Sequence, residues 1–368
     1  MNMMEFPFKV LTICGCWQPQ SWTSVYKHIY RIYTILILLS VHTFTLSQLM
    51  DIILIVDNTD DFCDNLCILV VTIMTCFKMF SLLANRKNII ELTDILMKEP
   101  CKPFKPNEIK IFYKFDKDIQ VNTFNYTVMS LISCASFAFT SFFTNFSERK
   151  LMFRAWLPFE YSSMTIFCLA FVHQLIASFM ATLVNVGCDS LIFGLLANVC
   201  CQFEILTYRL KGIMLHSDGL RNCVEQHCKI FKLAFLVNSK FRTVIGVQFL
   251  MSMFVVCFNL YEISILKLDV RCIRLAIFMT AMLTQIFIYC WYGNQVRFKS
   301  RQFLDNLFEI EWFTLDNNLK KSLLIMMERT VMPIEITSAY TISVNLDSFI
   351  GVLKTSYSAY NLLRQMNE

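Results

Sequence analysis

The sequence predicts an all-α membrane protein: a seven-transmembrane helical bundle with a cytosolic N-terminus, an extracellular C-terminus and a cytosolic helical anchor region. Three observations predict this fold. Of the 368 residues, 56% are hydrophobic and only 17% are charged, whereas soluble domains average about half apolar and about a quarter charged. Seven stretches are long and apolar enough to cross a bilayer. The basic residues are distributed unevenly between the segments that join these stretches.

The seven spans are read from length and hydropathy. A helix needs about 20 mostly apolar residues to cross the hydrocarbon core of a bilayer. The stretches that meet this requirement are residues 32–56, 66–84, 121–143, 161–186, 243–265, 273–294 and 337–360. They lie in one predicted domain, residues 1–368, whose cytosolic anchor helices are expected at about 187–242 and 296–336.

A helix much longer than a bilayer is predicted in the middle of the chain. No proline lies between Pro158 and Pro333, so residues 161–215 can form one near-continuous helix. It would be about 80 Å long, whereas the hydrocarbon core is about 30 Å thick. Its second half must project into the cytosol, where an oligomer interface is favoured over purely intramolecular packing. Residues 98–118, rich in Pro and Lys, are expected to form a mobile loop.

Charge bias sets the predicted orientation. With the N-terminus inside, 24 of the 33 Lys and Arg residues lie in cytosolic segments and seven in outer segments. Cytosolic loops of membrane proteins are enriched in Lys and Arg. The first outer loop, residues 57–64, is acidic and has no basic residue. G-protein-coupled receptors have the opposite orientation and are excluded.

The sequence holds no set of residues typical of catalysis or of a metal site. There is no P-loop, G-x-S-x-G, H-E-x-x-H or dinucleotide-binding glycine pattern. The net charge of +5 is small and no basic run indicates nucleic acid. We therefore expect no enzyme, no cofactor, no metal and no nucleic-acid partner. Cysteines near the predicted outer surface could form a disulfide, namely Cys63, Cys67 and Cys272, and the outer sequon Asn145-Phe-Ser147 is a candidate for glycosylation.

The last span carries a polar stripe. Asp347, Gly351, Lys354, Ser358, Asn361 and Gln365 recur at helical spacing and share one face. Charged groups within a span usually face water or the interior of a bundle. The stripe therefore predicts either a pore wall, to which each subunit contributes one helix, or ion pairs inside a packed bundle. The candidate pore-lining residues are Asp347, Lys354, Ser358, Asn361, Leu362 and Leu363, with the gate at the outer end.

A second candidate site lies in the outer half of the bundle. Several spans offer Phe, Met and hydroxyl side chains at one depth, which suits a small, apolar, volatile ligand. Taken singly, each of these residues is more often plain core or lipid-facing. The candidate ligand-binding residues are Val70, Ile73, Met74, Phe77, Ser133, Ser136, Phe137, Thr140, Phe167, Phe171, Gln174, Phe278, Met279 and Met282.

The second half of the chain, about residues 160–363, resembles the insect odorant receptors. The resemblance is carried by Gln174 and by the segments Val184–Phe193, Gln202–Leu210, Cys223–His227, Tyr289–Asn294, Phe308–Trp312 and Lys354–Leu363. Phe308 stands where this family usually has Tyr. The long insertion between spans four and five that marks the shared coreceptor is absent, which indicates a ligand-tuning subunit.

This resemblance implies an odorant-gated, non-selective cation channel that needs no G protein. It implies a heterotetramer with the coreceptor, a pore from the seventh helix and an odorant pocket in the outer half of spans two to six. It also implies the plasma membrane of a sensory dendrite as the location. The motif residues that it assigns to subunit anchoring are Asp189, His227, Phe308 and Trp312. A tastant-gated gustatory receptor is the alternative, although its C-terminal Thr-Tyr-x5-Gln-Phe pattern is not met. A transporter is less favoured because no internal repeat is found.

Overall fold

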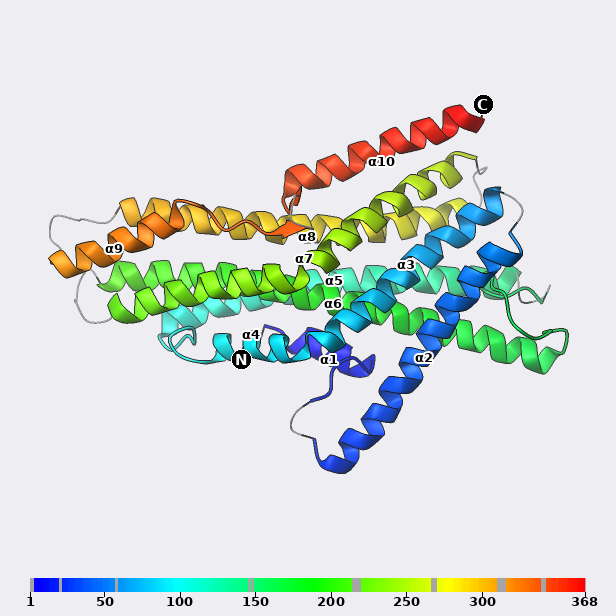
Figure 1. The fold of residues 1–368 in the computed structure, drawn as a ribbon, viewed down its shortest axis with the longest axis horizontal. Helices are drawn as coiled ribbons and strands as arrows, with labels where there is room; N and C mark the ends of the chain where they lie inside the picture. The colour runs from blue at the N-terminus through cyan, green and yellow to red at the C-terminus, as the bar shows by residue number, and fades with distance from the viewer. Residues whose placement is uncertain are drawn as a thin grey trace.

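The computed structural model describes residues 3–19, 22–56, 59–144, 146, 149–213, 220–265, 270–309, 316–338 and 342–367. Ten helices and two short strands lie within these ranges. In chain order they are α1 (Glu5–Ile13), α2 (Ser24–Leu54), α3 (Thr59–Ala84), α4 (Arg86–Met97), α5 (Pro106–Thr144), α6 (Met164–Ile213), α7 (Leu220–Ile265), α8 (Val270–Phe308), α9 (Asn317–Thr330), β1 (Thr337–Ser338), β2 (Ile342–Ser343) and α10 (Leu346–Asn367). The long helices α5 to α8 run along the long axis of the molecule, and α2 and α10 are inclined to them (Figure 1).

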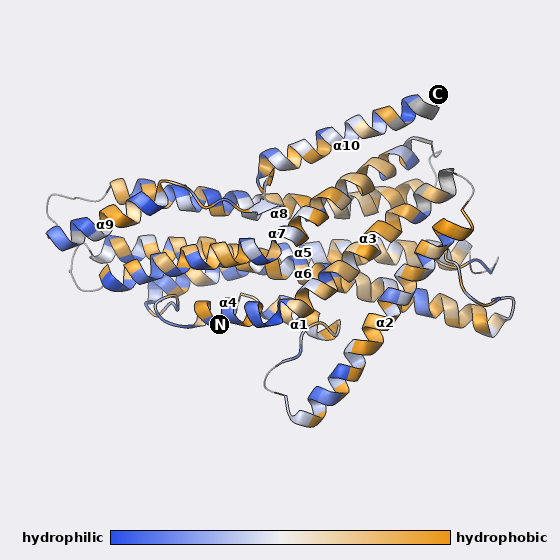
Figure 2. Cartoon of the chain, in the orientation of Figure 1, coloured by the Kyte–Doolittle hydropathy of each residue, from blue (hydrophilic) through white to orange (hydrophobic). Residues whose placement is uncertain are grey.

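Six of the described helices are long and apolar enough to cross a membrane. They span Ser24–Leu54, Asn65–Ala84, Pro106–Thr144, Met164–Gly212, Leu220–Ser264 and Val270–Phe308. The helix at the seventh predicted span, α10, is more polar because it carries Asp347, Lys354 and Arg364. Hydrophobic residues dominate α2, α3 and the adjoining halves of α5 to α8, whereas α4 and α9 are mixed with hydrophilic residues (Figure 2).

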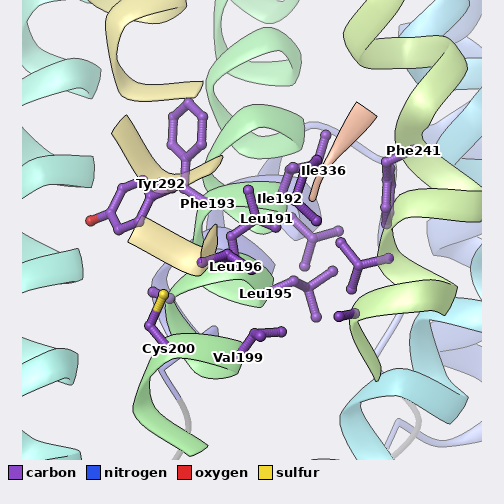
Figure 3. Close-up of a cluster of buried hydrophobic side chains, with 14 of the residues drawn as sticks. Leu191, Ile192, Phe193, Leu195, Leu196, Val199, Cys200, Phe241, Tyr292 and Ile336 are labelled. Atoms are coloured by element: carbon purple, nitrogen blue, oxygen red, sulfur yellow. The ribbon is translucent and has the colours of Figure 1, made fainter. Parts of the chain in front are cut away.

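The central helix is α6. The absence of proline predicted that it would be long and continuous. Its 50 residues correspond to about 75 Å at 1.5 Å per residue, so the expectation of a helix longer than a bilayer is met. Every side chain from Val186 to Phe203 is buried, because α1, α5, α7 and α8 surround this part of the helix. An apolar helix enclosed on all sides is a core element rather than a surface helix. Figure 3 shows this core, where Phe193 stacks on Tyr292 of α8 at a centroid distance of 5.9 Å.

The first helix packs against α6 at two glycines. A Cβ atom added at Gly187 would lie 2.7 Å from Cδ2 of Leu11, and one at Gly194 would lie 3.2 Å from Cγ of Met4. These glycines are seven residues apart and therefore lie on one face of α6. Their missing side chains allow α1 to approach closely. The sequence predicted residues 1–31 only as a cytosolic segment, so this helix is an addition to that prediction.

The prediction that residues 98–118 form one mobile loop is wrong, because α5 begins at Pro106. The remaining connection, residues 98–105, is held by buried polar contacts. Arg209 Nε donates to Oε1 of Glu108 at 3.0 Å, and the same guanidinium donates to the carbonyl oxygens of Pro100 and Lys102. Gln202 Nε2 donates to the carbonyl oxygen of Cys101 at 2.9 Å. The end of the bundle predicted to be cytosolic is thus a packed unit.

The last helix begins later than the sequence predicted. The seventh span was expected at residues 337–360, but Thr337–Ser338 and Ile342–Ser343 pair as antiparallel strands and the helix runs from Leu346 to Asn367. Asn345 caps the N-terminus of this helix, because its Oδ1 accepts from the N–H of Ser348 at 2.9 Å.

Candidate functional site

A cavity of about 110 Å³ lies among α3, α5, α6, α7 and α8. Its walls are mainly apolar and include Phe44, Phe137, Phe153 and Phe278. Ring contacts join these walls: Phe137 lies 5.7 Å from both Phe153 and Phe278, measured between centroids. Concave, largely apolar cavities with a few polar groups are the usual form of small-molecule sites.

A polar cluster closes one side of this cavity. Tyr126 and Gln285 line the cavity and both donate to Oδ2 of Asp189, Tyr126 at 2.9 Å. Oδ1 of Asp189 accepts from Nζ of Lys78 and from the hydroxyl of Tyr289, each at 2.6 Å. The carboxylate is therefore fully paired although it is buried, as burial of a charge requires.

Six of the fourteen predicted ligand-binding residues line this cavity. They are Val70, Met74, Ser133, Phe137, Phe278 and Met282. The other eight do not line it: Ile73, Phe77, Ser136, Thr140, Phe167, Phe171, Gln174 and Met279. Ile73 is 39% exposed on the outer surface of the bundle, and Phe77 packs against the main core.

Three of those eight residues support the cavity from outside. Phe167 and Phe171 pack against Phe146, at centroid distances of 5.4 and 5.5 Å, and they belong to the same buried apolar cluster as the cavity residues Phe137 and Phe278. Gln174 forms two hydrogen bonds of 3.0 Å with the backbone of Phe153, one to its N–H and one to its carbonyl oxygen. Because Phe153 lines the cavity, Gln174 fixes one of its walls rather than facing a ligand.

The polar stripe of α10 faces away from the bundle. Asp347, Gly351, Lys354, Ser358 and Gln365 are exposed and Asn361 is partly exposed. The opposite face packs on α7 and α8, where the hydroxyl of Ser356 donates to the carbonyl oxygen of Met253 at 3.3 Å. Leu362 is 62% exposed, and the side chain of Leu363 lies outside the described part of the structure. Within this chain the stripe forms no internal ion pairs among the described residues.

Two of the four predicted anchor residues are in the interior of the chain. Asp189 is fully buried in the polar cluster, and His227 is 1% exposed, contacts Thr330 Oγ1 at 3.1 Å through Nε2 and stacks on Phe303. Neither is placed to contact another subunit, so their assignment to a subunit interface is corrected to internal packing. Phe308 is 64% exposed at the end of α8. Trp312 lies outside the described residues.

The outer disulfide that the sequence left open does not form between the two described candidates. Cys67 and Cys272 are both free thiols. The side chain of Cys63 and the sequon residue Asn145 lie outside the described part of the structure. Glycosylation at Asn145 therefore remains a prediction.

Several cavity residues were missed from the sequence. Phe44 of α2, Phe153 of the α5–α6 connection and Gln248 of α7 lie outside the spans from which candidates were drawn. Tyr126 and Gln285 lie on α5 and α8, which supplied other candidates. Two glutamines in apolar helices were a usable signal, since polar residues within spans usually face the bundle interior.

The protein-family model described as "7tm Odorant receptor" matches residues 58–357 of this chain. The chain belongs to this odorant receptor family. The family is one of receptors, so the expectation that the chain is not an enzyme is confirmed, and so is its place among multi-pass membrane proteins. The match also favours an odorant receptor over the gustatory receptor and transporter considered above.

Known proteins resemble this odorant receptor over most of its length. Odorant receptor 46a, isoform A, of Drosophila melanogaster is 26% identical over 302 residues, which are 79% of this chain and 78% of that protein. The insect olfactory receptor OR5 from Machilis hrabei, in a structure with eugenol, has a TM-score of 0.88 at 14% identity, covering 99% of this chain and 97% of that chain. A second structure of OR5 has a TM-score of 0.85 at 15% identity, with the same coverage. This similarity confirms the predicted all-α, seven-transmembrane fold of the receptor.

Proposed function

We propose that this odorant receptor is the ligand-tuning subunit of an odorant-gated, non-selective cation channel that works with the shared coreceptor in the plasma membrane of sensory neurons. The supporting observation is the apolar cavity among α3, α5, α6, α7 and α8. Binding of a small apolar volatile there would favour the open channel to the extent that the open state binds it more tightly.

The size of the cavity limits the ligand. An engineered apolar cavity of about 150 Å³ binds benzene, and this cavity has about 110 Å³. A molecule with about one six-membered ring, or a short chain of the same volume, is therefore the expected size class. Larger odorants would require the surrounding side chains to move.

The pore would be formed by α10 from each subunit. Its polar residues are exposed in the single chain, and charged groups at membrane depth are expensive unless they face water or a protein partner. Asp347 and Lys354 would face such a water-filled path. Phe308, exposed at the end of α8, would lie in the anchoring interface between subunits.

Helix α7 connects the two sites. Its residues Met251 and Val255 line the cavity, and the carbonyl oxygen of Met253, between them, accepts from Ser356 of α10. A ligand that shifts this turn of α7 would therefore also act on the pore helix.

The test is an electrical recording from cells that express the chain with and without the coreceptor, over a panel of small volatiles. We expect odorant-evoked cation current that requires both subunits and persists when G-protein signalling is blocked. Current from this chain alone, or substrate uptake without current, would contradict the proposal.

A cavity-filling variant adds a structural control. Ala181 lines the cavity and is 4% exposed, so Ala181→Phe should abolish the odorant response. Ile176 lies on the same helix and is 47% exposed. Ile176→Phe adds a ring at the outer surface and should leave the response unchanged.

A further inference from the structure

We propose that the cavity selects ligands with a hydroxyl group that donates a hydrogen bond to Oε1 of Gln248. This inference rests on the proposed odorant pocket and specifies the chemical class of its ligand. Gln248 lines the cavity and its side chain is 2% exposed. Its Oε1 atom is buried and has no hydrogen-bond partner among the described residues. A buried acceptor without a partner is uncommon and calls for an explanation.

The orientation of this amide is fixed by the neighbouring charge. Asp189 is a carboxylate and accepts only, so the atom of Gln285 that contacts Oδ2 must be its donor, Nε2. Oε1 of Gln285 then accepts from Nε2 of Gln248 at 3.0 Å. The same Nε2 donates its other hydrogen to Oγ of Ser252 at 2.9 Å. Both amino hydrogens of Gln248 are thereby used, and its carbonyl oxygen is the group that remains.

Several hydroxyls that line the cavity have already committed their protons to the protein. Ser178 donates to the carbonyl oxygen of Leu175 at 3.0 Å, and Thr182 to that of Ser178 at 2.9 Å. Tyr126 donates to Asp189. These groups cannot donate to Gln248 without breaking an existing hydrogen bond. The cavity therefore presents an acceptor to the ligand, and a ligand O–H supplies the missing donor.

Ring-sized alcohols and phenols meet both requirements of size and chemistry. An ether of similar volume fills the same apolar space but has no proton to donate. A hydrogen bond between neutral groups contributes on the order of 1 kcal/mol, which corresponds to roughly a five- to tenfold difference in effective concentration. We expect an alcohol to activate the receptor at a concentration lower by about this factor than its methyl ether.

The experiment compares matched probes on the receptor co-expressed with the coreceptor. Phenol, benzyl alcohol and cyclohexanol are each tested against their own methyl ether and their parent hydrocarbon, and the half-maximal concentrations for cation current are measured. The quantity of interest is the ether-to-alcohol ratio of these concentrations, which is independent of expression level.

Two variants locate the effect. Gln248→Met retains an unbranched side chain of similar length without the carbonyl. The ratio should then fall to one or below, because the methyl ether carries one more apolar carbon than the alcohol. Thr127→Val removes a hydroxyl that does not line the cavity and that donates to the carbonyl oxygen of Thr123 at 2.6 Å, and the ratio should remain that of the parent receptor. If Gln248→Met fails to reach the cell surface, the ratio in the parent receptor decides the question.

The outcomes separate this inference from the proposed function. Equal responses to alcohols and ethers in the parent receptor overturn the inference and leave the odorant-gated channel standing; a buried water that satisfies Gln248 would give this result. A ratio that persists in Gln248→Met also overturns it. Absence of any odorant-evoked current with the coreceptor present overturns the proposed function itself.

Discussion

Lys78 and Asp189 form an ion pair in which neither side chain is exposed to solvent, with 2.6 Å between Nζ and Oδ1. Lys78 lies on α3 and Asp189 on α6. The hydroxyls of Tyr126 on α5 and Tyr289 on α8 donate to the same carboxylate. One buried charge thus joins four helices beside the cavity, and it also orients Gln285 and, through it, Gln248.

Removal of one member of this pair should destabilise the receptor strongly. Asp189→Asn retains the shape of the side chain but leaves the Lys78 ammonium buried without a counter-charge. Breaking a buried pair on one side typically costs about 3–5 kcal/mol. We expect a large fall in the midpoint of thermal unfolding of the purified protein.

The double variant Lys78→Met/Asp189→Asn is the control for that prediction. It removes both charges, so it should be more stable than Asp189→Asn alone, because no uncompensated charge remains. If the losses of stability in Lys78→Met and Asp189→Asn simply add in the double variant, the two side chains do not stabilise each other as an ion pair.

The same pair shows how far the sequence alone could predict the site. Lys78 is visible as a charge within an apolar span, but its partner is 111 positions away, and no local pattern connects them. The resemblance to the family marked Asp189 as important and assigned it to a subunit contact. Its hydrogen bonds to residues of α3, α5 and α8 show that it organises the interior instead.

The sequence predicted where the helices lie better than it predicted which face of each helix points into the bundle. The long α6 follows from the absence of proline, and the apolar spans follow from hydropathy. Within a span, however, lipid-facing and core-facing residues are both apolar, so periodicity does not separate them. Ile73 and Met74 are neighbouring apolar residues, yet Ile73 is 39% exposed and Met74 is 2% exposed and lines the cavity.

Gly293 should not tolerate even the smallest side chain. A Cβ atom there would overlap the backbone of Val344, the residue that follows β2 and precedes the α10 cap Asn345. Overpacking of this kind typically costs about 1–3 kcal/mol. We expect Gly293→Ala to lower the midpoint of thermal unfolding and to change the odorant response, since the substitution displaces the start of α10, the proposed pore helix.

Gly351 provides the matched control for that substitution. It also lies in a helix, but a Cβ atom added there meets nothing within 4 Å. Gly351→Ala should be neutral or slightly stabilising, because Ala has a higher helix propensity than Gly by about 1 kcal/mol. A similar loss of stability in both variants would contradict the specific role of the Gly293 contact.

The predicted orientation can be tested with a native thiol. Cys228 is exposed on the part of α7 that the charge bias places in the cytosol. A membrane-impermeant maleimide added outside intact cells should leave it unlabelled, and permeabilisation should allow the reaction. Gln365→Cys, at the exposed end of α10, should be labelled from outside in intact cells. The reversed pattern would overturn the cytosolic N-terminus.

Cys101 should be far less reactive than Cys228. Burial in the connection between α4 and α5 raises the pKa of the Cys101 thiol from 9.0 to about 11. The thiolate is the reactive form, and a raised pKa keeps the folded protein in the thiol form until the pH approaches that value. Labelling followed by mass spectrometry should show Cys228 modified at pH 8 and Cys101 protected. Protection of Cys101 should disappear when the protein is unfolded; equal rates in the folded protein would contradict its burial.

The polar stripe of α10 provides the test of the pore. Asp347 and Ser358 are exposed and Asn361 is partly exposed, all on the face away from the bundle. If this face lines the pore, Asp347→Ala, Ser358→Ala and Asn361→Ala should each change the relative permeability to different cations, because a pore wall acts through the charges and dipoles that the ions meet. Removal of the Asp347 carboxylate should have the largest effect and should reduce cation permeation. Reversal potentials in mixed ionic solutions measure these changes.

Ser356 is the matched control on the opposite face of the same helix. Its hydroxyl is occupied by the carbonyl oxygen of Met253, and its side chain is 1% exposed. Ser356→Ala should therefore leave the permeability ratios of the proposed channel unchanged. It should alter the odorant concentration needed for half-maximal current, because it weakens the contact between α10 and α7. If none of the three stripe variants changes the permeability ratios, the stripe faces a partner helix rather than water. If Ser356→Ala changes ion selectivity as strongly as they do, the permeability changes report distortion of α10 rather than contact with the ions.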